Sequence, residues 1–163
     1  MNLQISKLNS TDYLFKEFKN IRDNLLTALG CTIETNPSIF HWKITLIGPK
    51  DTPYADGIFI LKVDFVITYP YPKPEIRFVN KIYHLNISSI NGSISLPILD
   101  DWTPYTNMLN VISNIFNLFY NQVPSNSFDL IRAEEYKTDI NEFNRKAKEW
   151  TKKYASKNNK FNN

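Results

Sequence analysis

The sequence predicts a single α+β domain, in which an antiparallel sheet is covered on one face by a buried helix. An amphipathic helical period near the start is followed by alternating strand patterns, then by a long stretch with neither period, and finally by further helical periods. With 163 residues, 42% of them hydrophobic and 14% aromatic, the chain can bury one core of ordinary size. We therefore expect one domain over residues 1–156 and a frayed polar tail over residues 157–163.

The first element is predicted to be a helix that ends near Gly30. Ser10, Thr11 and Asp12 are candidate N-cap residues, because their side-chain oxygens can accept a backbone N–H of the first helical turn. Apolar side chains then recur every three or four residues, which places them on one helix face. They are Leu14, Phe18, Ile21, Leu25 and Ala28.

Three segments rich in β-branched and aromatic residues are predicted to be strands. They are residues 40–47, 58–65 and 76–79. In the second segment apolar residues alternate with Lys62 and Asp64, which is typical of a strand with one face in water. Prolines between the first two segments favour a turn, where Gly57 is expected to allow a positive φ, so a meander is implied. The prolines of residues 70–74 exclude a helix or a central strand there.

Residues 81–102 show neither period, yet they are too apolar and too rich in turn-forming residues for a disordered linker. Long ordered loops usually carry function, so we expect a functional site there. Three helical segments follow, and the first is apolar nearly all round and must be buried. They are residues 108–120, 129–137 and 140–154.

Composition narrows the possible functions. The net charge of +3 and the scattered Lys and Arg residues give little case for nucleic acid as a partner. The single cysteine, Cys31, cannot form an internal disulfide or a cysteine-based metal site, and it is predicted to be a small semi-buried hydrophobe. The sequence contains no recognisable signal segment, phosphate-binding loop or dinucleotide fingerprint. We therefore expect no cofactor, no membrane partner and a cytoplasmic or nuclear location.

A series of short motifs runs in order from about residue 12 to residue 155. They are Phe40-His41-Trp42, Gly48-Pro49, Asp51-Thr52-Pro53-Tyr54, Gly57 with Phe59, Tyr69-Pro70, Lys81-Ile82-Tyr83-His84, Asn86-Ile87, Gly92, Ile94, Leu96, Ile98-Leu99, Trp102, Pro104, Tyr136-Lys137-Thr138-Asp139 and Glu149-Trp150-Thr151-Lys152-Lys153-Tyr154-Ala155. In their order and spacing these motifs resemble the ubiquitin-conjugating enzymes. The resemblance implies that family's fold: an N-terminal helix, an antiparallel four-stranded meander, a long active-site loop, a buried helix across the sheet and two C-terminal helices.

In that family the position of Ser95 holds the catalytic cysteine. The cysteine takes ubiquitin or a related modifier from an activating enzyme as a thioester and passes it to a lysine. A thiol with a pKa of about 8.5 is partly ionised at neutral pH, whereas an alcohol needs an adjacent general base. No Ser/His/Asp-type arrangement can be identified in the sequence. Ser95 therefore predicts either loss of transfer or a trapped oxyester that turns over slowly.

The neighbours of Ser95 follow the family pattern unevenly. The family's His-Pro-Asn reads His84-Leu85-Asn86. The resemblance gives His84 a mainly structural role and gives Asn86 the role of stabilising the oxyanion formed when lysine attacks. The Asn86 side chain can equally tie its loop to the backbone. Pro97 stands where the family generally has a polar or acidic residue, so a backbone donor and a carboxylate are both missing.

Asn126 lies where the family has a gate residue near the active site, although an ordinary loop asparagine is an equally simple interpretation. The segment Ile98-Leu99-Asp100-Asp101-Trp102 is one residue shorter than usual, so neither aspartate receives a role. Two origins of Ser95 remain open. The joint departures argue for natural divergence, whereas the well-matched C-terminal helices argue for an active enzyme whose cysteine was replaced.

Two loops and the first helix correspond to the surface that binds the activating enzyme and ligases in the family. The candidate residues are Tyr71, Pro72, Pro104, Tyr105, Lys16 and Lys19. Exposed aromatic side chains suit such a role, because they supply much contact area at low entropy cost. The alternatives are loop aromatics packed onto their own domain and an ordinary solvated helix face.

Two functions therefore stay open. The first is a conjugating enzyme for ubiquitin or a ubiquitin-like modifier, with its cysteine replaced. The second is a catalytically inactive variant that binds the modifier, or an active conjugating enzyme, as an adaptor. A structural module that merely kept the fold would leave the retained Asn86 unexplained.

Overall fold

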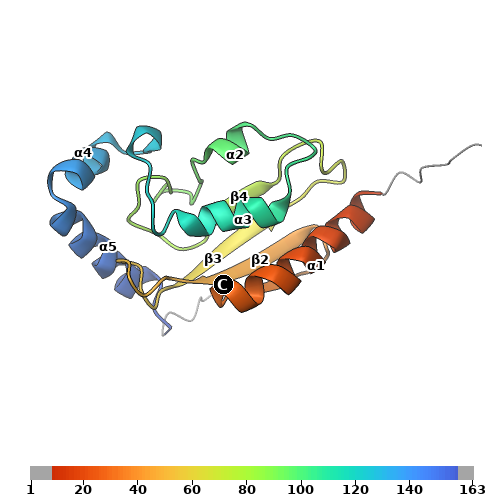
Figure 1. Cartoon of the computed structure of the whole chain (residues 1–163), viewed down its shortest axis with the longest axis horizontal. Coiled ribbons are helices and arrows are strands. Elements are labelled where there is room, and N and C mark those ends of the chain that lie inside the picture. Colours follow the sequence, from red (N-terminus) through yellow and green to blue (C-terminus); the bar gives the residue numbers. More distant parts are fainter. Residues whose placement is uncertain (1–8, 158–163) are drawn as a thin grey trace, which may run out of the picture.

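The computed structural model describes residues 9–157, which form an α+β domain around one four-stranded sheet (Figure 1). The strands lie in the order β1-β2-β3-β4 and every neighbouring pair is antiparallel. The elements are α1 (Ser10–Leu29), β1 (Thr32–Thr35), β2 (His41–Ile47), β3 (Ile58–Asp64), β4 (Glu75–Phe78), α2 (Pro97–Asp100), α3 (Met108–Asn117), the 3₁₀ turn η1 (Pro124–Asn126), α4 (Leu130–Thr138) and α5 (Ile140–Tyr154). The predicted fold class is confirmed. Of the predicted tail, residues 158–163 lie outside the described part of the chain.

Helix α1 begins earlier than its sequence suggested. Its N-cap is Asn9, whose Oδ1 accepts the backbone N–H of Asp12 at 2.8 Å. The prediction that placed the cap one to three residues later is wrong. Ser10 lies inside the helix, and its hydroxyl donates to the carbonyl oxygen of Ile67 at 2.6 Å. The helix ends at Gly30, as expected, with a φ of +61° that glycine adopts without strain.

Strands β2 and β3 turn one face to the core and the other to water, as the alternation of the sequence predicts. The water-facing side carries His41, Lys43, Lys62 and Asp64. The buried residues pair across the two strands as Trp42 with Val63, Ile44 with Leu61, and Leu46 with Phe59. The outer strand β1 supplies the fourth strand, which only the family resemblance had implied.

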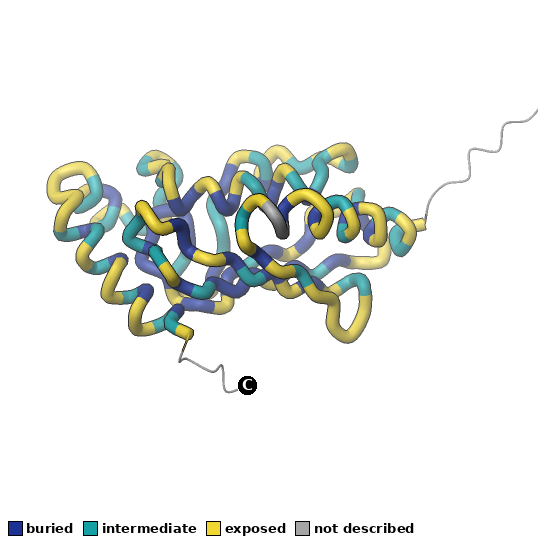
Figure 2. The backbone as a smooth tube through the Cα atoms, turned by 60° about the horizontal axis from the view of Figure 1, so that its bottom comes forward, coloured by how far each residue is buried: buried dark blue, intermediate teal, exposed yellow. Residues whose placement is uncertain are grey.

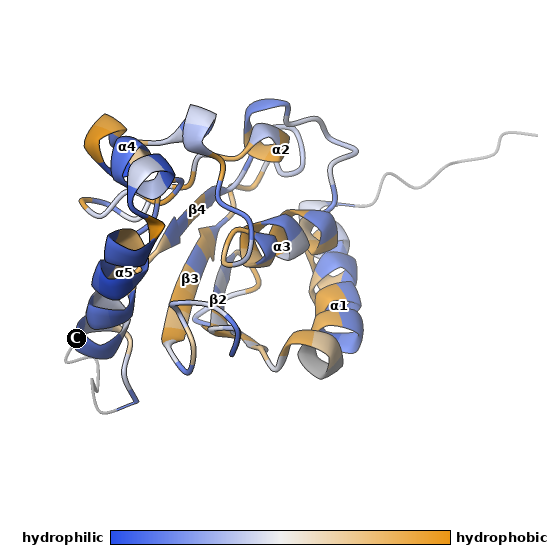
Figure 3. Cartoon of the chain, turned by 60° about the vertical axis from the view of Figure 1, so that its left-hand side comes forward, coloured by the Kyte–Doolittle hydropathy of each residue, from blue (hydrophilic) through white to orange (hydrophobic). Residues whose placement is uncertain are grey.

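Helices α1 and α3 both cover the buried face of the sheet, and they lie next to each other in Figures 1 and 3. Phe18 of α1 meets Trp42 of β2 edge to face, with ring centroids 5.7 Å apart. The ring centroid of Phe119, just after α3, lies 4.9 Å from that of Phe59 in β3. The buried stretches of the chain accordingly meet between the helices and the sheet (Figure 2).

A buried carboxylate fixes the start of α3. Glu17 of α1 is almost fully buried, and both of its oxygens lie 3.3 Å from the backbone nitrogen of Met108, which donates to them. The hydroxyl of Tyr69 also donates to Glu17, at 3.4 Å. Burial raises the pKa of the Glu17 carboxyl above its usual value. The helix ends at Asn117, three residues before its predicted end.

Gly57 has a role other than the one its position suggested. The positive φ in this turn belongs to Asp56, at 61°, and the prediction of a positive φ at Gly57 is wrong. A Cβ at residue 57 would lie 2.6 Å from the ring of Phe59 and 2.7 Å from the methyl group of Thr151. Glycine is therefore required there because the chain passes close to α5.

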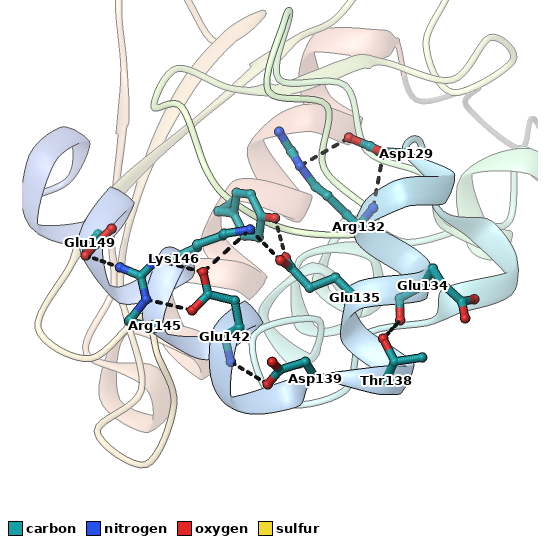
Figure 4. A network of polar contacts seen from close by, with 11 residues as sticks. Asp129, Arg132, Glu134, Glu135, Thr138, Asp139, Glu142, Arg145, Lys146 and Glu149 are labelled. Atoms are coloured by element: carbon teal, nitrogen blue, oxygen red, sulfur yellow. Dashed lines mark hydrogen bonds and ion pairs between the residues drawn. The ribbon is translucent and has the colours of Figure 1, made fainter.

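The two C-terminal helices are held to each other by charged side chains (Figure 4). Lys146 of α5 pairs with Glu135 of α4, which also accepts the hydroxyl of Tyr83 at 2.5 Å. The end of α5 is attached to the sheet, since the amide of buried Asn80 donates to the carbonyl oxygen of Tyr154 at 2.9 Å. Helix α5 therefore closes the domain beyond the end of the strands.

Within residues 9–157, none of the helices has the length and apolar character needed to cross a membrane. The same residues contain no group of three or more His, Cys, Asp or Glu side chains that could hold a metal ion. Cys31 is buried between α1 and β1, and its Sγ donates to the carbonyl oxygen of Leu25 at 3.4 Å. Burial raises the pKa of the Cys31 thiol, which disfavours the reactive thiolate.

Candidate functional site

The segment that contains Ser95 forms a small hairpin, which we call the 86–95 hairpin. Ile87 and Ile94 form an antiparallel bridge, and the N–H of Ser95 donates to the carbonyl oxygen of Asn86 at 2.9 Å. At the other end the N–H of Gly92 donates to the carbonyl oxygen of Ser88, also at 2.9 Å. Ser95 thus lies where the hairpin ends, directly before Leu96 and α2.

The hairpin extends the sheet beyond β4. The N–H of Phe78 donates to the carbonyl oxygen of Gly92 at 2.9 Å, and Arg77 bridges to Ser93. Gly92 has a φ of +76°, and a Cβ there would lie 2.0 Å from the carbonyl oxygen of Phe78. Only glycine fits this position, both for its φ and for the closeness of the two backbones.

Ser95 itself is half-buried. Within residues 9–157 its hydroxyl makes no hydrogen bond, so no base is positioned to remove its proton. The short helix α2 begins two residues later with Pro97 at its first position, where a helix needs no N–H from the residue. Pro97 therefore costs the local structure no hydrogen bond. The long loop predicted over residues 81–102 contains this helix, which the aperiodic sequence did not reveal.

The side chain of Asn86 is fully buried, and its amide is hydrogen-bonded to a neighbouring segment. Its Nδ2 donates to the carbonyl oxygens of Val123 at 2.8 Å and Asn126 at 3.1 Å, and its Oδ1 accepts the N–H of Val123 at 2.8 Å. Both amide hydrogens are engaged, so a bond to an oxyanion would require breaking one of these contacts. The geometry accordingly makes Asn86 the tie between the hairpin and residues 123–126.

His84 is buried with both ring nitrogens occupied. Nδ1 accepts the N–H of Asn86 at 2.9 Å, and Nε2 donates to the carbonyl oxygen of Leu118 at 2.9 Å. Burial lowers the pKa of His84 to about 4, although the Leu118 carbonyl favours the charged form. The ring is therefore neutral at physiological pH, and neither nitrogen is available to remove a proton from Ser95.

Leu85 takes part in a chain of hydrogen bonds that proline could not complete. Its N–H donates to Gln122 Oε1 at 2.8 Å, and Gln122 Nε2 donates to the hydroxyl oxygen of Tyr54 at 2.9 Å. The Tyr54 hydroxyl in turn donates to the carbonyl oxygen of Tyr83 at 2.8 Å. The Leu85 side chain is fully buried as well. Leu85 is thus accommodated by its surroundings through both its backbone and its side chain.

The structure places Asn126 beside this site through its backbone. Its carbonyl oxygen accepts a hydrogen bond from Asn86 Nδ2. Its side chain is half-exposed, and the Oδ1 accepts the hydroxyl of Ser125 at 3.3 Å. Asp100 and Asp101 are both exposed at the end of α2. Among the residues the structure describes, neither carboxylate makes a hydrogen bond or ion pair with the hairpin.

The comparisons with known proteins agree with this architecture. The family model described as "Ubiquitin-conjugating enzyme" matches residues 13–151. The chain belongs to the ubiquitin-conjugating enzyme family. It is 39% identical over 139 residues to ubiquitin conjugating enzyme E2 B of Dictyostelium discoideum, a match that covers 84% of this chain and 94% of the relative.

Two solved structures are similar over most of their length. The E2 domain of a Toxoplasma gondii ubiquitin conjugating enzyme superposes with a TM-score of 0.77 at 32% identity, covering 88% of this chain and 98% of that one. A Plasmodium yoelii structure gives the same TM-score and identity, with 94% of its chain covered. The ubiquitin-conjugating fold predicted from the motifs is therefore confirmed.

In this family member the two candidate partner loops lie side by side. The indole N–H of Trp102 donates to the carbonyl oxygen of Pro70 at 3.0 Å. This bond joins the loop between β3 and β4 to the loop after α2. Tyr71 is 72% exposed and Tyr105 is 93% exposed, so neither ring packs onto its own domain. Pro72 is exposed beside Tyr71, and Pro104 is half-buried. Lys16 and Lys19 are both exposed on α1.

Sequence reasoning missed two residues that hold the site together. Gln122 follows α3 in an irregular segment, and Arg132 lies in the first turn of α4, with Ser89 of the hairpin as a partner. Both side chains reach segments more than thirty positions away along the chain. No local pattern marks such a residue, because its role depends on which loops the tertiary fold brings together.

Proposed function

We propose that this protein is a scaffold of the ubiquitin or ubiquitin-like conjugation pathway, with Ser95 at the position of the family's catalytic cysteine. The family match over residues 13–151 carries this proposal. The hairpin that ends at Ser95 supports it, because the hairpin holds residue 95 at a fixed place between β4 and residues 123–126. The partner surface that suits an activating enzyme and a ligase is the one formed by Tyr71, Pro72, Pro104 and Tyr105 on the paired loops, with Lys16 and Lys19 on α1.

With serine at position 95, the chain is expected to be inactive or to form only a stable oxyester. If Ser95 accepted a modifier, its Oγ would form a bond to the modifier's C-terminal carbonyl carbon while the bond from that carbon to the activating enzyme's sulfur breaks. The hydroxyl proton would end on the leaving thiol. Within residues 9–157 no hydrogen bond activates the hydroxyl, so this step lacks the base that an alcohol needs. An oxyester is also a poorer acyl donor to an amine than a thioester.

The decisive experiment is Ser95→Cys, incubated with activating enzyme, ubiquitin and ATP. We expect a modifier adduct that a thiol reductant removes, while the unchanged chain gives no adduct or one that resists the reductant. Ser93→Cys is the matched control, because Ser93 is also half-buried in the same hairpin but two residues away. If Ser95→Cys forms no adduct with ubiquitin or any related modifier, the enzyme scaffold is ruled out.

One set of contacts favours a second candidate, a naturally inactive variant that acts as an adaptor. Leu85 and Pro97 both depart from the family pattern, and each fits its surroundings: Leu85 through Gln122 and Pro97 as the first residue of α2. A single replacement of a cysteine would not have produced these adjustments. Exposed Ile90 in the hairpin turn and the exposed first residues of α4, Leu130 and Ile131, offer apolar contact surface.

The adaptor predicts binding without transfer. NMR titration of the unchanged chain with ubiquitin-like proteins, and with an active conjugating enzyme, should then shift amide signals at sub-millimolar concentration. The absence of shifts with all of them at near-millimolar concentration would remove this candidate. We propose that either candidate acts in the cytoplasm or the nucleus.

A further inference from the structure

Arg132 joins four segments of the site at one point. It lies in the first turn of α4, and its side chain is only 15% exposed. The guanidinium carbon lies 4.4 Å from the ring centroid of Tyr83 and 5.4 Å from that of Trp150, within the range of cation–π attraction. Tyr83 directly precedes His84, and Trp150 belongs to α5. Arg132 therefore packs between the start of the active-site loop and the last helix.

The polar edge of the same group contacts the hairpin. Nη2 donates to Ser89 Oγ at 3.2 Å. Nε lies 3.3 Å from Asp129 Oδ2 (Figure 4). The Asp129 carboxylate is itself held, because its Oδ1 accepts the N–H groups of Ile131 at 2.9 Å and Arg132 at 3.2 Å. The guanidinium is thus oriented by a fixed carboxylate before it reaches Ser89.

Ser89 belongs to the turn of the 86–95 hairpin. The turn is closed by two bonds at 2.9 Å, from the N–H of Gly92 to the carbonyl oxygen of Ser88 and from the N–H of Ser88 to that of Ser93. The other end of the hairpin is held by the Asn86 amide on residues 123–126. Both ends of the hairpin are consequently attached to the single stretch of chain that runs from residue 123 to residue 132.

We propose that Arg132 is the positioning residue of this site: by binding Ser89 it holds the hairpin turn in place and so sets the position of residue 95. Arginine suits this role because its planar group can stack on two rings and still direct separate N–H donors at Ser89 and Asp129. Lysine keeps the charge but offers a single ammonium without a stacking face. The inference rests on the proposed function only in taking residue 95 as the working position.

The test is amide hydrogen exchange, followed by NMR on the full chain. In Arg132→Met the protection of the Ser88, Gly92 and Ser95 amides should fall at least tenfold, while the amides of β2 and β3 change less than twofold. Arg132→Lys should give an intermediate loss. Arg145→Met is the matched control, because Arg145 also forms ion pairs with carboxylates, those of Glu142 and Glu149, but on the exposed side of α5.

Exchange needs no activating enzyme, so its outcome is separate from that of the transfer assay. Equal loss in hairpin and sheet, or less than twofold loss in the hairpin, would overturn the proposal, since Arg132 would then act only on overall stability or not at all. If Arg132→Met does not fold, Ser89→Ala removes the same bond and should loosen the hairpin amides at least threefold. No such loss in Ser89→Ala would also overturn it.

A second measurement reports on residue 95 directly. In Ser95→Cys the rate of thiol alkylation at high pH, where the thiol is fully ionised, measures how exposed residue 95 is. Adding Arg132→Met should raise this plateau rate at least threefold, and adding Arg145→Met should leave it unchanged. A residue that serves overall stability alone would not change the plateau under native conditions, so an unchanged rate contradicts the proposal.

Discussion

At the scale of single residues, most polar side chains of the site already make hydrogen bonds within the protein. Asn86 has both amide hydrogens bonded to backbone carbonyls, and His84 has both ring nitrogens occupied. Residues that carry chemistry in a working site usually keep a free donor or acceptor for the substrate. Among the residues that the structure describes, the hydroxyl of Ser95 makes no hydrogen bond, and an alcohol is hardly ionised at neutral pH.

The neutral state of His84 makes the stability of the protein depend on pH. The unfolded pKa of about 6.5 falls to about 4 on folding, so between these values the unfolded chain binds more protons. Stability should therefore be complete above pH 6.5 and fall as the pH drops towards 4, by up to about 3 kcal/mol. Urea unfolding of the unchanged chain and of His84→Gln between pH 4 and 8 measures this contribution as a difference.

The comparison of the two proteins is needed because Glu17 changes the stability with pH in the opposite direction to His84. Its raised pKa means that the folded state holds the Glu17 proton more tightly, so its contribution falls as the pH rises through that raised value. If the difference between the two proteins does not change between pH 7 and pH 4, His84 is not neutral in the way its contacts indicate.

At the scale of elements, the helices begin and end where particular side chains satisfy their backbone. Asparagine caps α1 and α3, through Asn9 and Asn107, and Asp129 caps α4. The sequence placed the start of α4 at residue 129, which is its cap residue, so this start was correct to within one residue. Three polar residues in a row follow Asn9, and the sequence does not show which of the four lies outside the helix.

Replacement of Asn9 tests the cap of α1. Asn9→Ala removes the acceptor of the Asp12 N–H and should lower the free energy of unfolding by about 1 kcal/mol. Thr11→Ala, at a residue first considered as a cap, should change it by less than about 0.5 kcal/mol. Thermal unfolding followed by circular dichroism compares the two. A larger loss of unfolding free energy for Thr11→Ala than for Asn9→Ala would show that Asn9 is not the cap.

At the scale of the whole molecule, the last helix is fastened to the middle of the sheet. Buried Asn80 accepts the N–H of Ile60 at 2.7 Å and donates to the carbonyl oxygens of Ile58 at 3.2 Å and Tyr154 at 2.9 Å. The N–H of Ile58 also donates to the carbonyl oxygen of Ala155 at 2.7 Å. The C-terminal helices are therefore part of the same folded unit as the sheet.

Asn80→Ala should release the end of α5. It leaves the Ile60 N–H and two carbonyl oxygens without their partner, which should cost about 2–4 kcal/mol of unfolding free energy. Asn141→Ala, at an exposed position of α5, should cost less than about 0.5 kcal/mol. Chemical denaturation measures both. Equal stability of the two variants would show that α5 is held by its apolar face alone.

The local patterns of the sequence were sufficient to predict most helices and strands and to identify the family. Alternation in β3 and the apolar period of α1 predicted most of their buried side chains, because side-chain direction repeats with the geometry of the element itself. Ala28, the last residue of the predicted period in α1, is exposed. The motifs identified the ubiquitin-conjugating fold, and they located Ser95 in the long aperiodic segment of residues 81–102. Those conclusions depend on neighbours in the chain, which the sequence displays directly.

The tertiary structure alone decided how the site is held. The Asn86 amide meets residues 123 and 126, Leu85 meets Gln122, and Arg132 meets Ser89, over separations of 37 to 43 positions. A hydrogen bond depends on distance and angle between two groups, and these are known only once the sheet and helices have been packed. For this reason the sequence could name Ser95, Asn86 and His84, but only the fold could show that the side chains of Asn86 and His84 are already hydrogen-bonded. It also showed that the Ser95 hydroxyl has no such bond within residues 9–157.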